Sequence, residues 1–536
     1  MGRIIGAPSR VPEMAMYDVS RFVRRLVPAL ALVLAACGTN PVTGKKELQL
    51  VGEAEEIAIG QQSYEPARQA QGGDYVIDPG LTEYVREVGN RLAAVSDRKL
   101  PYEFAVLNDS VPNAWAMPGG KIAVNRGLLY ELKSESELAA VLGHEIVHAA
   151  ARHGAKSMER GYLLQGAVMA VGLGSQNQKY SQLYVQGAQI AAQLVSTRYG
   201  RDAELESDLY GTRYMKRAGY DPRASITLQE TFVRLSKGRQ QSFIDGLFAS
   251  HPPSEERVAA NRKTAAELGD GGDAGEERYK QKTADLFRRK PAYDAHAEGV
   301  RALAKGDYPA ATTSAKRAIA LEPQEARFHE LLGDIELGQK RLDTALVHYA
   351  QAIRLQENYF KPHVQSGIAL FSAGRRGDAE PYLRRSLQLL PTAPAHYFLG
   401  ILSEERGKVD EALQHYEVAA GAGSDLGRQA SARFVRLDLP RNPARYLQAD
   451  VQAATDGTLY AILQNAAPVP LVDVSLRVVR SDGQRIVEQT PTFTLREPLQ
   501  PGKVAQIPMV RATMRSPGDI QFYRVVVESV RAMPQQ

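Results

Sequence analysis

The stretch SESELAAVLGHEIVH, residues 134–148, decides how the first half of this chain folds. Ser134 and Glu137 have the spacing of a capping box, which predicts that a helix begins here. Apolar residues follow at helical spacing, namely Leu138, Val141 and Leu142. The pattern therefore predicts a largely buried helix that runs through the last five residues of the stretch, 144–148.

The end of this helix has the residue types of a hydrolytic metal site. His144 and His148 lie on one helix face, so both imidazoles can reach one ion. Glu145 is rotated beside them, where it can take a proton from an attacking water and pass it to a leaving amine. A surface helix with two solvated histidines is the alternative, which the apolar flanks oppose because a buried imidazole pair needs a ligand. The motif thus indicates Zn²⁺, one ion per chain.

Two histidines do not hold catalytic zinc, so a third ligand is required. The best candidate segment is RDAELESDLYG, residues 201–211. This segment resembles the second ligand-bearing helix of gluzincins of the HtpX and BepA branch, which reads roughly Arg-x-x-Glu-x-x-Ala-Asp-x-x-Gly. The resemblance implies that Glu204 is the third ligand and that Asp208 orients a ligand histidine. Ser207 departs from the usual Ala, and Glu206 competes as a ligand on composition alone but lies on another helix face.

Further parts of the chain resemble the same family. The segment Asn113 to Gly120, followed by the strand-like run Lys121 to Asn125, resembles the family's edge strand beside the cleft, to which an extended substrate can add. The residues expected to bind substrate are Asn113, Ala114, Gly120 and Ile122. The alternative is that these residues only terminate a strand. Arg152 and His153, which follow the motif as in the family, are interpreted as structural.

The dipeptide His251-Pro252 corresponds to a loop that covers the zinc in BepA-like proteins. The resemblance implies that His251 is a fourth ligand that displaces the catalytic water, so that the enzyme rests in a latent state. The alternative is a loop histidine before a helix that enters at residues 253–256. A separate apolar run, Gly161 to Gly174, is too short to span a membrane and favours a buried or mobile helix over an interfacial segment.

Residues 293–440 contain an internal repeat. Small residues recur at steps of 34, 34 and 33, in two sets: Gly299, Gly333, Gly367 and Gly400, and Ala311, Ala345, Ala379 and Ala412. Bulky residues recur with them at Tyr349, Tyr382 and Tyr416. The period matches the tetratricopeptide repeat, in which pairs of antiparallel helices stack into a curved array. The array is expected to bind protein, with a rigid spacer as the alternative.

Two other segments complete the second half of the chain. Residues 268–292 are predicted to be a linker, because 269–277 are rich in Gly and Asp. Residues 445–536 are predicted to form a β-sandwich of the immunoglobulin-like kind. This prediction rests on period-two alternation in one run, with apolar Val472, Val474, Leu476 and Val478.

The N-terminus, residues 1–37, has the pattern of a bacterial signal peptide with a lipobox. Positive residues precede a short apolar run that ends in Leu34-Ala35-Ala36-Cys37. Cys37, the single cysteine, is therefore expected to be lipidated, with a plain signal peptide as the alternative. The formal charge of +5 falls to +2 without the leader, which argues against nucleic acid as a partner.

The sequence predicts a multidomain, mainly α protein: a helical zinc-peptidase domain with a small β-sheet over 38–267, an α-solenoid of repeats and a C-terminal β-sandwich. The resemblance to BepA-like proteases implies a zinc endopeptidase of the bacterial cell envelope that cleaves misfolded or misassembled envelope proteins. Its repeats would bind the client or the outer-membrane assembly machinery. The expected location is the periplasmic face of the outer membrane, or the soluble periplasm if no lipid is attached. The alternative function is a chaperone-like binding protein with a latent zinc site.

Overall fold

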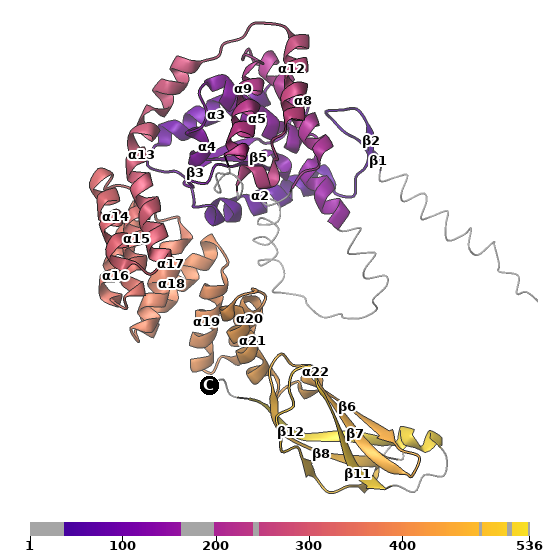
Figure 1. The fold of residues 1–536 in the computed structure, drawn as a ribbon. Coiled ribbons are helices and arrows are strands. Elements are labelled where there is room, and N and C mark those ends of the chain that lie inside the picture. The colour runs from indigo at the N-terminus through magenta and orange to yellow at the C-terminus, as the bar shows by residue number, and fades with distance from the viewer. Residues whose placement is uncertain (1–36, 162–197, 239–245, 482–484, 512–516, 534–536) are drawn as a thin grey trace, which may run out of the picture.

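The chain is mainly helical, with its small sheets at the two ends (Figure 1). The computed structural model describes residues 37–161, 198–238, 246–481, 485–511 and 517–533. The predicted leader before Cys37 and all but the first residue of the apolar run at 161–174 lie outside the described residues. Over the described ranges, the helices are too short or too polar for any of them to cross a membrane.

The first region is built around one central helix. Its labelled helices are α2 (Glu53–Ala70), α3 (Pro79–Ala93), α4 (Arg126–Leu129), α5 (Glu135–Ala150), α8 (Arg201–Arg217), α9 (Ala224–Lys237), α11 (Leu247–Ser250) and α12 (Glu255–Leu268). Residues 153–161, the last ones described before residue 198, are also helical. Its strands are β1 (Cys37–Thr39), β2 (Lys46–Leu48), β3 (Glu103–Leu107), β4 (Ala114–Met117) and β5 (Lys121–Asn125), with a 3-10 turn at Pro118–Gly120. Helix α5 packs against α3, α8, α9 and β4, and all of its residues are buried.

The start of α5 follows the capping pattern in the sequence. The Ser134 hydroxyl accepts the backbone N–H of Glu137 at 3.1 Å. The Glu137 carboxylate in turn accepts the backbone N–H of Lys133 at 2.7 Å, one residue before the position that a capping box usually uses. The predicted helix start is confirmed.

Two glycines allow α5 and α8 to cross in close contact. A Cβ on Gly143 would lie 3.1 Å from the carbonyl oxygen of Gly211, and one on Gly211 would lie 2.9 Å from the backbone nitrogen of His144. These distances are tighter than ordinary contacts, so a side chain at either position would push the helices apart. The glycine pair therefore sets the distance between the histidines of α5 and the carboxylates of α8.

The sheet of the first region has the strand order β3-β5-β4, with β3 parallel and β4 antiparallel to β5. The expectation that Lys121 to Asn125 belongs to the edge strand is therefore wrong, because β5 is hydrogen-bonded on both sides. The edge beside α5 is β4. Ile122 lies in the middle of the sheet, and its carbonyl accepts the Tyr64 hydroxyl at 2.7 Å.

The predicted linker at 268–292 is mostly helical. Helix α12 ends at Leu268, and α13 (Glu276–Ala304) starts after only seven residues. The glycine-rich composition covers that short loop, where Gly269, Gly271 and Gly272 adopt positive φ. The residues after Gly275 are mainly Glu, Lys, Arg and Ala, which favour helix, so α13 continues from the loop into the first repeat.

The repeats form a row of antiparallel helix pairs (Figure 1). After α13 these helices are α14 (Tyr308–Leu321), α15 (Ala326–Gly338), α16 (Leu342–Leu355), α17 (Phe360–Ser372), α18 (Arg376–Leu389), α19 (Ala393–Glu405), α20 (Val409–Ala420) and α21 (Asp425–Asp438). A Cβ on Gly333 would overlap the Tyr349 ring, and one on Gly400 would lie 2.6 Å from the Tyr416 ring. The recurring glycines thus let an aromatic ring pack flat against the neighbouring helix.

One of the three recurring tyrosines does not pack in this way. The Tyr382 side chain is 37% exposed. Leu383 packs against Gly367 in its place, and a Cβ on Gly367 would lie 2.6 Å from the Leu383 side chain. In each of these repeats the packing residue follows its glycine by 16 positions, as Tyr349 follows Gly333. The expectation that Tyr382 is a packing residue was wrong because the spacing to its own glycine decides the contact.

The first repeats dock on the peptidase region through polar contacts that are buried or partly buried. The Arg327 guanidinium donates to the carbonyl of Gly72 at 3.1 Å, and the Asn108 amide donates to Glu325 at 3.0 Å. The Gln69 amide donates to the carbonyl of Asn358 at 2.6 Å. The beginning of the array is therefore fixed against the region that contains α5.

The C-terminal region consists of two antiparallel sheets that share a core. One sheet has the order β11 (Val504–Arg511), β7 (Thr458–Asn465), β6 (Leu447–Ala453), and the other has β10 (Phe493–Thr494), β8 (Leu471–Ser481), β12 (Tyr523–Ala532), with β9 (Ile486–Gln489) also on β8. Residues of both sheets meet in one cluster, for example Leu463 and Leu476. The predicted alternation fails at its start, because a bulge at Asp473 (φ 52°) buries Leu471 in place of Val472.

Candidate metal centre

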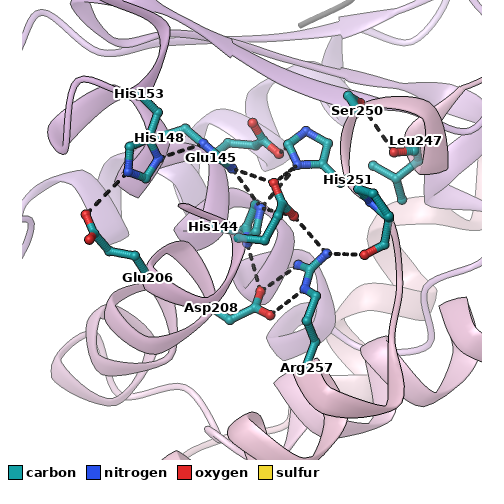
Figure 2. A network of polar contacts seen from close by, with 12 residues as sticks. His144, Glu145, His148, His153, Glu206, Asp208, Leu247, Ser250, His251 and Arg257 are labelled. Atoms are coloured by element: carbon teal, nitrogen blue, oxygen red, sulfur yellow. Dashed lines mark hydrogen bonds and ion pairs between the residues drawn. The ribbon is translucent and has the colours of Figure 1, made fainter. Parts of the chain in front are cut away.

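Four side chains from three segments converge beside α5 (Figure 2). His144 and His148 come from the last turns of α5, Glu204 comes from the first turn of α8, and His251 directly follows α11. All four are buried, and one potential ligand atom of each lies within 4.8 Å of the others. The structure therefore brings together the four residues that the sequence suggested as metal ligands.

His144 has one ring nitrogen toward the cluster and one toward a carboxylate. Its Nε2 lies 2.9 Å from Nε2 of His148 and 3.5 Å from Oε2 of Glu204. Its Nδ1 lies 2.8 Å from Oδ1 of Asp208. Burial lowers the pKa of His144, but the carboxylates of Glu204 and Asp208 outweigh burial and raise it to about 9. The site thus attracts positive charge at the point where the ligand atoms meet.

Arg257 of α12 is a residue of this site that the sequence analysis missed. Its Nε and Nη2 donate to both oxygens of Asp208 at 2.7 and 2.8 Å, and its Nη1 lies 2.8 Å from Oε2 of Glu204. Burial alone would raise the pKa of Asp208, but Arg257 and His144 hold it below its usual range. The only sequence signal was indirect: two buried carboxylates on one helix face require a cation.

His148 is enclosed on all sides. Its Nε2 lies 3.5 Å from Oε1 of Glu204, and its Nδ1 lies 2.9 Å from Nδ1 of His153. The Tyr199 ring, a second contact that the sequence analysis missed, stacks on the His148 ring with centroids 4.0 Å apart. Burial holds the pKa of His148 well below its usual range, so the ring is neutral and able to act as a metal ligand. Glu206 contacts His153 and not the cluster.

Glu145 lies on the opposite side of the cluster from Asp208. Its Oε1 is 3.7 Å from Nε2 of His251, and its buried Oε2 accepts no hydrogen bond from the described residues. Burial raises the pKa of Glu145. A raised pKa brings a carboxylate closer to the range in which it can both take and return a proton.

His251 is held among the other ligands by its own segment. Its Nδ1 lies 3.0 Å from Oε1 of Glu204 and 3.3 Å from Nε2 of His144. Its backbone N–H donates to the carbonyl of Leu247 at 2.7 Å, and the Leu247 N–H donates to the carbonyl of Pro112 just before β4. A cavity of about 30 Å³ lies beside His144, Glu145 and His251. His251 therefore lies among the other candidate ligands, in the position that a fourth ligand would occupy.

The donor set fits a zinc ion. The Nε2 atoms of His144 and His148 lie 2.9 Å apart beside Glu204, while their Nδ1 atoms have other partners. Two imidazoles and one carboxylate, with a glutamate beside them, are the ligand types of catalytic zinc. A bound cation would take both Nε2 atoms as ligands and balance the charge of the Glu204 carboxylate.

The other predicted site residues lie apart from this cluster. Asn113 and Ala114 are buried at the start of β4, and the Asn113 carbonyl accepts the Asn125 N–H at 2.8 Å. Gly120, with φ 84°, packs against Tyr102 at the turn before β5. Cys37 is the first described residue, in β1.

Comparison with known proteins agrees with this geometry. Residues 79–265 match Peptidase family M48, and residues 296–359 and 364–426 match the tetratricopeptide repeat. Over 376 residues the chain is 26% identical to the "Beta-barrel assembly-enhancing protease" of Escherichia coli (strain K12), covering 65% of this chain and 75% of the relative.

Two further relatives match mainly the peptidase region. The chain is 33% identical over 182 residues to "Metalloprotease YcaL" of Escherichia coli (strain K12), covering 33% of this chain and 66% of the relative. It is 32% identical over 224 residues to "Mitochondrial metalloendopeptidase OMA1" of Schizosaccharomyces pombe, covering 41% and 63%. The resemblance to BepA-like proteases is thereby confirmed. The chain thus combines a Peptidase family M48 domain at residues 79–265 with tetratricopeptide repeats, and it is a BepA-like metalloendopeptidase.

Proposed function

We propose that this metalloendopeptidase uses one zinc ion per chain, with His144, His148 and Glu204 as ligands. The observation that carries the proposal is the convergence of these three side chains within 4.8 Å, beside a buried glutamate. When bound, zinc polarises the scissile carbonyl and lowers the pKa of the attacking water toward neutrality.

The protein's own residues then move the proton and hold the ligands. Glu145 takes the proton from the attacking water and passes it to the nitrogen of the leaving amine. Asp208 accepts the Nδ1–H of His144, so that Nε2 keeps its lone pair for the metal. Arg257 holds Asp208 and Glu204 in their ionised forms.

We propose further that the enzyme rests in a latent state. His251 occupies the position of a fourth ligand, where it would exclude the attacking water. Cleavage then requires that the segment Leu247 to His251 moves away from Glu204 and from the carbonyl of Pro112. An extended substrate would next lie along the edge strand β4, near Asn113 and Ala114, in the manner of strand addition.

The cellular role is proposed from the relatives and from the repeats. The relative from Escherichia coli is called a β-barrel assembly-enhancing protease. This supports a protease that acts on misfolded or misassembled envelope proteins during outer-membrane assembly. The repeat array would bind the client or the assembly machinery. Lipidation at Cys37 would anchor the chain at the periplasmic face of the outer membrane. Replacing Cys37 with Ser should release the chain into the soluble periplasmic fraction, whereas continued membrane attachment would refute the anchor.

A chaperone-like binding protein is the second candidate, because His251 lies 3.0 Å from Glu204, where a fourth ligand would exclude the attacking water. One experiment separates the two. The full chain is purified in detergent, its zinc content is measured, and cleavage of an unfolded protein is followed for the wild type, Glu145→Gln and His251→Ala. The peptidase proposal predicts zinc in all three, faster cleavage by His251→Ala, and cleavage about 10²–10⁴-fold slower by Glu145→Gln. If the wild type and His251→Ala both hold zinc and neither cleaves, the binding protein is the correct function.

A further inference from the structure

The two zinc-ligand histidines are supported in different ways. His144 gives its Nδ1–H directly to a carboxylate, Asp208, at 2.8 Å. His148 has no carboxylate at its Nδ1. Instead, Nδ1 of His153 lies 2.9 Å away, and Nε2 of His153 lies 3.3 Å from Oε1 of Glu206 (Figure 2). The support of His148 is therefore a chain of two residues.

The protons along this chain can be assigned from the geometry. A separation of 2.9 Å between two ring nitrogens is a hydrogen-bond distance, so one of the two Nδ1 atoms must carry the proton. Nε2 of His148 faces Glu204 and His144, where a metal ligand needs a free lone pair. The proton of His148 is therefore on Nδ1, and His153 accepts it. His153 then carries its own proton on Nε2 and donates it to Glu206.

The backbone is arranged so that His153 reaches back to His148. Helix α5 ends at Ala150, and Arg152 adopts a left-handed conformation with φ 63°, which is uncommon for a residue other than glycine. Arg152 is held there by an ion pair from its Nε to Glu56 at 3.0 Å and by donation to the carbonyl of Val51. The next helix begins directly after Arg152, at residue 153, and its first turn places the His153 ring against the His148 ring.

A third contact fixes the plane of the His148 ring. The Tyr199 ring stacks on it at 4.0 Å with an interplanar angle of 27°, and also lies 6.0 Å from the His153 ring. The His148 side chain is fully buried, so water cannot replace a lost partner at Nδ1. Stacking sets the tilt of the ring, and His153 sets which nitrogen is protonated.

We propose that His153 and Glu206 are a positioning relay, which fixes the tautomer and orientation of His148 for zinc binding. The inference rests on the proposed zinc function, and it replaces the structural interpretation that the sequence favoured for His153. His153 acts through His148 and does not touch the substrate. Because a neutral imidazole stands where His144 has a carboxylate, the negative charge of Glu206 reaches His148 only through a second ring.

The test measures zinc affinity of the full chain in detergent, by competition with a chelator, for three variants. His153→Leu removes both the acceptor and the donor. His153→Gln keeps both, because the amide oxygen can accept from His148 and the amide nitrogen can donate to Glu206. Glu206→Gln keeps an acceptor but removes the charge. A matched control is His396→Leu, which removes a ring from another part-buried histidine pair, His396 with His415, in the repeats.

The relay predicts that His153→Leu weakens zinc binding about tenfold to a hundredfold, the usual loss when a partner of a ligand histidine is removed. His153→Gln should recover most of that affinity, Glu206→Gln should fall between the wild type and His153→Leu, and His396→Leu should bind as the wild type does. The absorption spectrum of the cobalt-substituted chain should change in His153→Leu and return in His153→Gln, because it reports ligand geometry.

Two results would overturn the relay alone. One is a wild type that binds zinc no more tightly than His153→Leu. The other is an equal loss of zinc affinity in His153→Leu and His153→Gln, which would mean that His153 acts through the shape of its ring and not through its hydrogen bonds. If His153→Leu fails to fold, the comparison of Glu206→Gln with the wild type decides, since the Glu206 side chain is partly exposed and unchanged affinity would refute the relay. A wild type without zinc would refute the proposed function as well.

Discussion

The peptidase region and the repeat array stabilise their folds in different ways. The peptidase region has one large core that extends from Val42 to Phe328 and a smaller cluster around Trp115, and charged residues such as Glu204 and Arg257 are buried in this region. The repeats have separate small clusters between neighbouring helices, built on contacts such as Gly400 with Tyr416. A change in the first region should therefore alter chemistry and global stability, whereas a change in the second should act locally.

The largest effect is expected from Glu145→Gln in the peptidase region. Loss of the general base should lower the rate of peptide cleavage about 10²–10⁴-fold while the zinc content stays constant, because Glu145 is not a ligand. The measurements are steady-state cleavage and metal analysis. Glu135→Gln is the control, since Glu135 is a buried glutamate of the same helix that pairs with Arg278. Equal loss of activity in both variants would contradict the assigned role.

Arg257→Met should destabilise the peptidase region by about 3–5 kcal/mol, because it leaves two buried carboxylates without their cation. Chemical unfolding of the zinc-loaded chain would measure the change. Arg262→Met is the matched control on the same helix. Its ion pair with Glu230 is largely exposed, so the free energy of unfolding should change little. A small effect of Arg257→Met would show that the metal alone balances these carboxylates.

In the repeats, Gly400→Ala should cost about 1–3 kcal/mol, because the new methyl group would overlap the Tyr416 ring. The neighbouring repeat offers a control in Gly377→Ala, where nothing lies within 4 Å of the added carbon and the helix should gain up to about 1 kcal/mol. Cleavage of a short peptide should be unchanged in both. If the Gly400→Ala variant lost zinc, the expectation that changes in the repeats act only locally would be refuted.

The smallest effect is a pH dependence of the repeats. Burial, together with His415, lowers the pKa of His396 to about 4. The unfolded chain therefore binds a proton at this residue as the pH falls below about 6.5, while the folded chain does not. The array should lose stability between about pH 6.5 and pH 4, and His396→Leu should reduce that loss. Thermal unfolding of both chains across this range would check it, and identical slopes would contradict the assignment.

The comparison also shows what the sequence could predict. Periodic or contiguous signals were sufficient: the start of α5 at Ser134, the strand Lys121–Asn125 and the close helix contacts at Gly333 and Gly400 all follow from local spacing. The four converging ligands were named because motifs on two helices and one loop each carried their own pattern.

What the sequence missed depends on contacts between distant segments. Arg257 follows no motif, and its role appears only where α12 crosses α8. His153 looked structural because its two partners, His148 and Glu206, meet only after the reversal at Arg152. At Tyr382 the packing position lies one residue later, and at Asp473 a bulge shifts the strand by one residue. A regular repeat length or strand alternation in the sequence does not reveal shifts of a single residue.

The most direct test of the metal centre is zinc X-ray absorption of the purified full chain, compared with His251→Ala. A zinc centre closed by His251 should hold one zinc per chain, with three imidazole nitrogens at about 2.0–2.1 Å and one carboxylate oxygen in the wild type. In His251→Ala one imidazole should be replaced by water oxygen. A chain without zinc would contradict the metal centre, and a coordination sphere that is the same in both proteins would contradict its closure by His251.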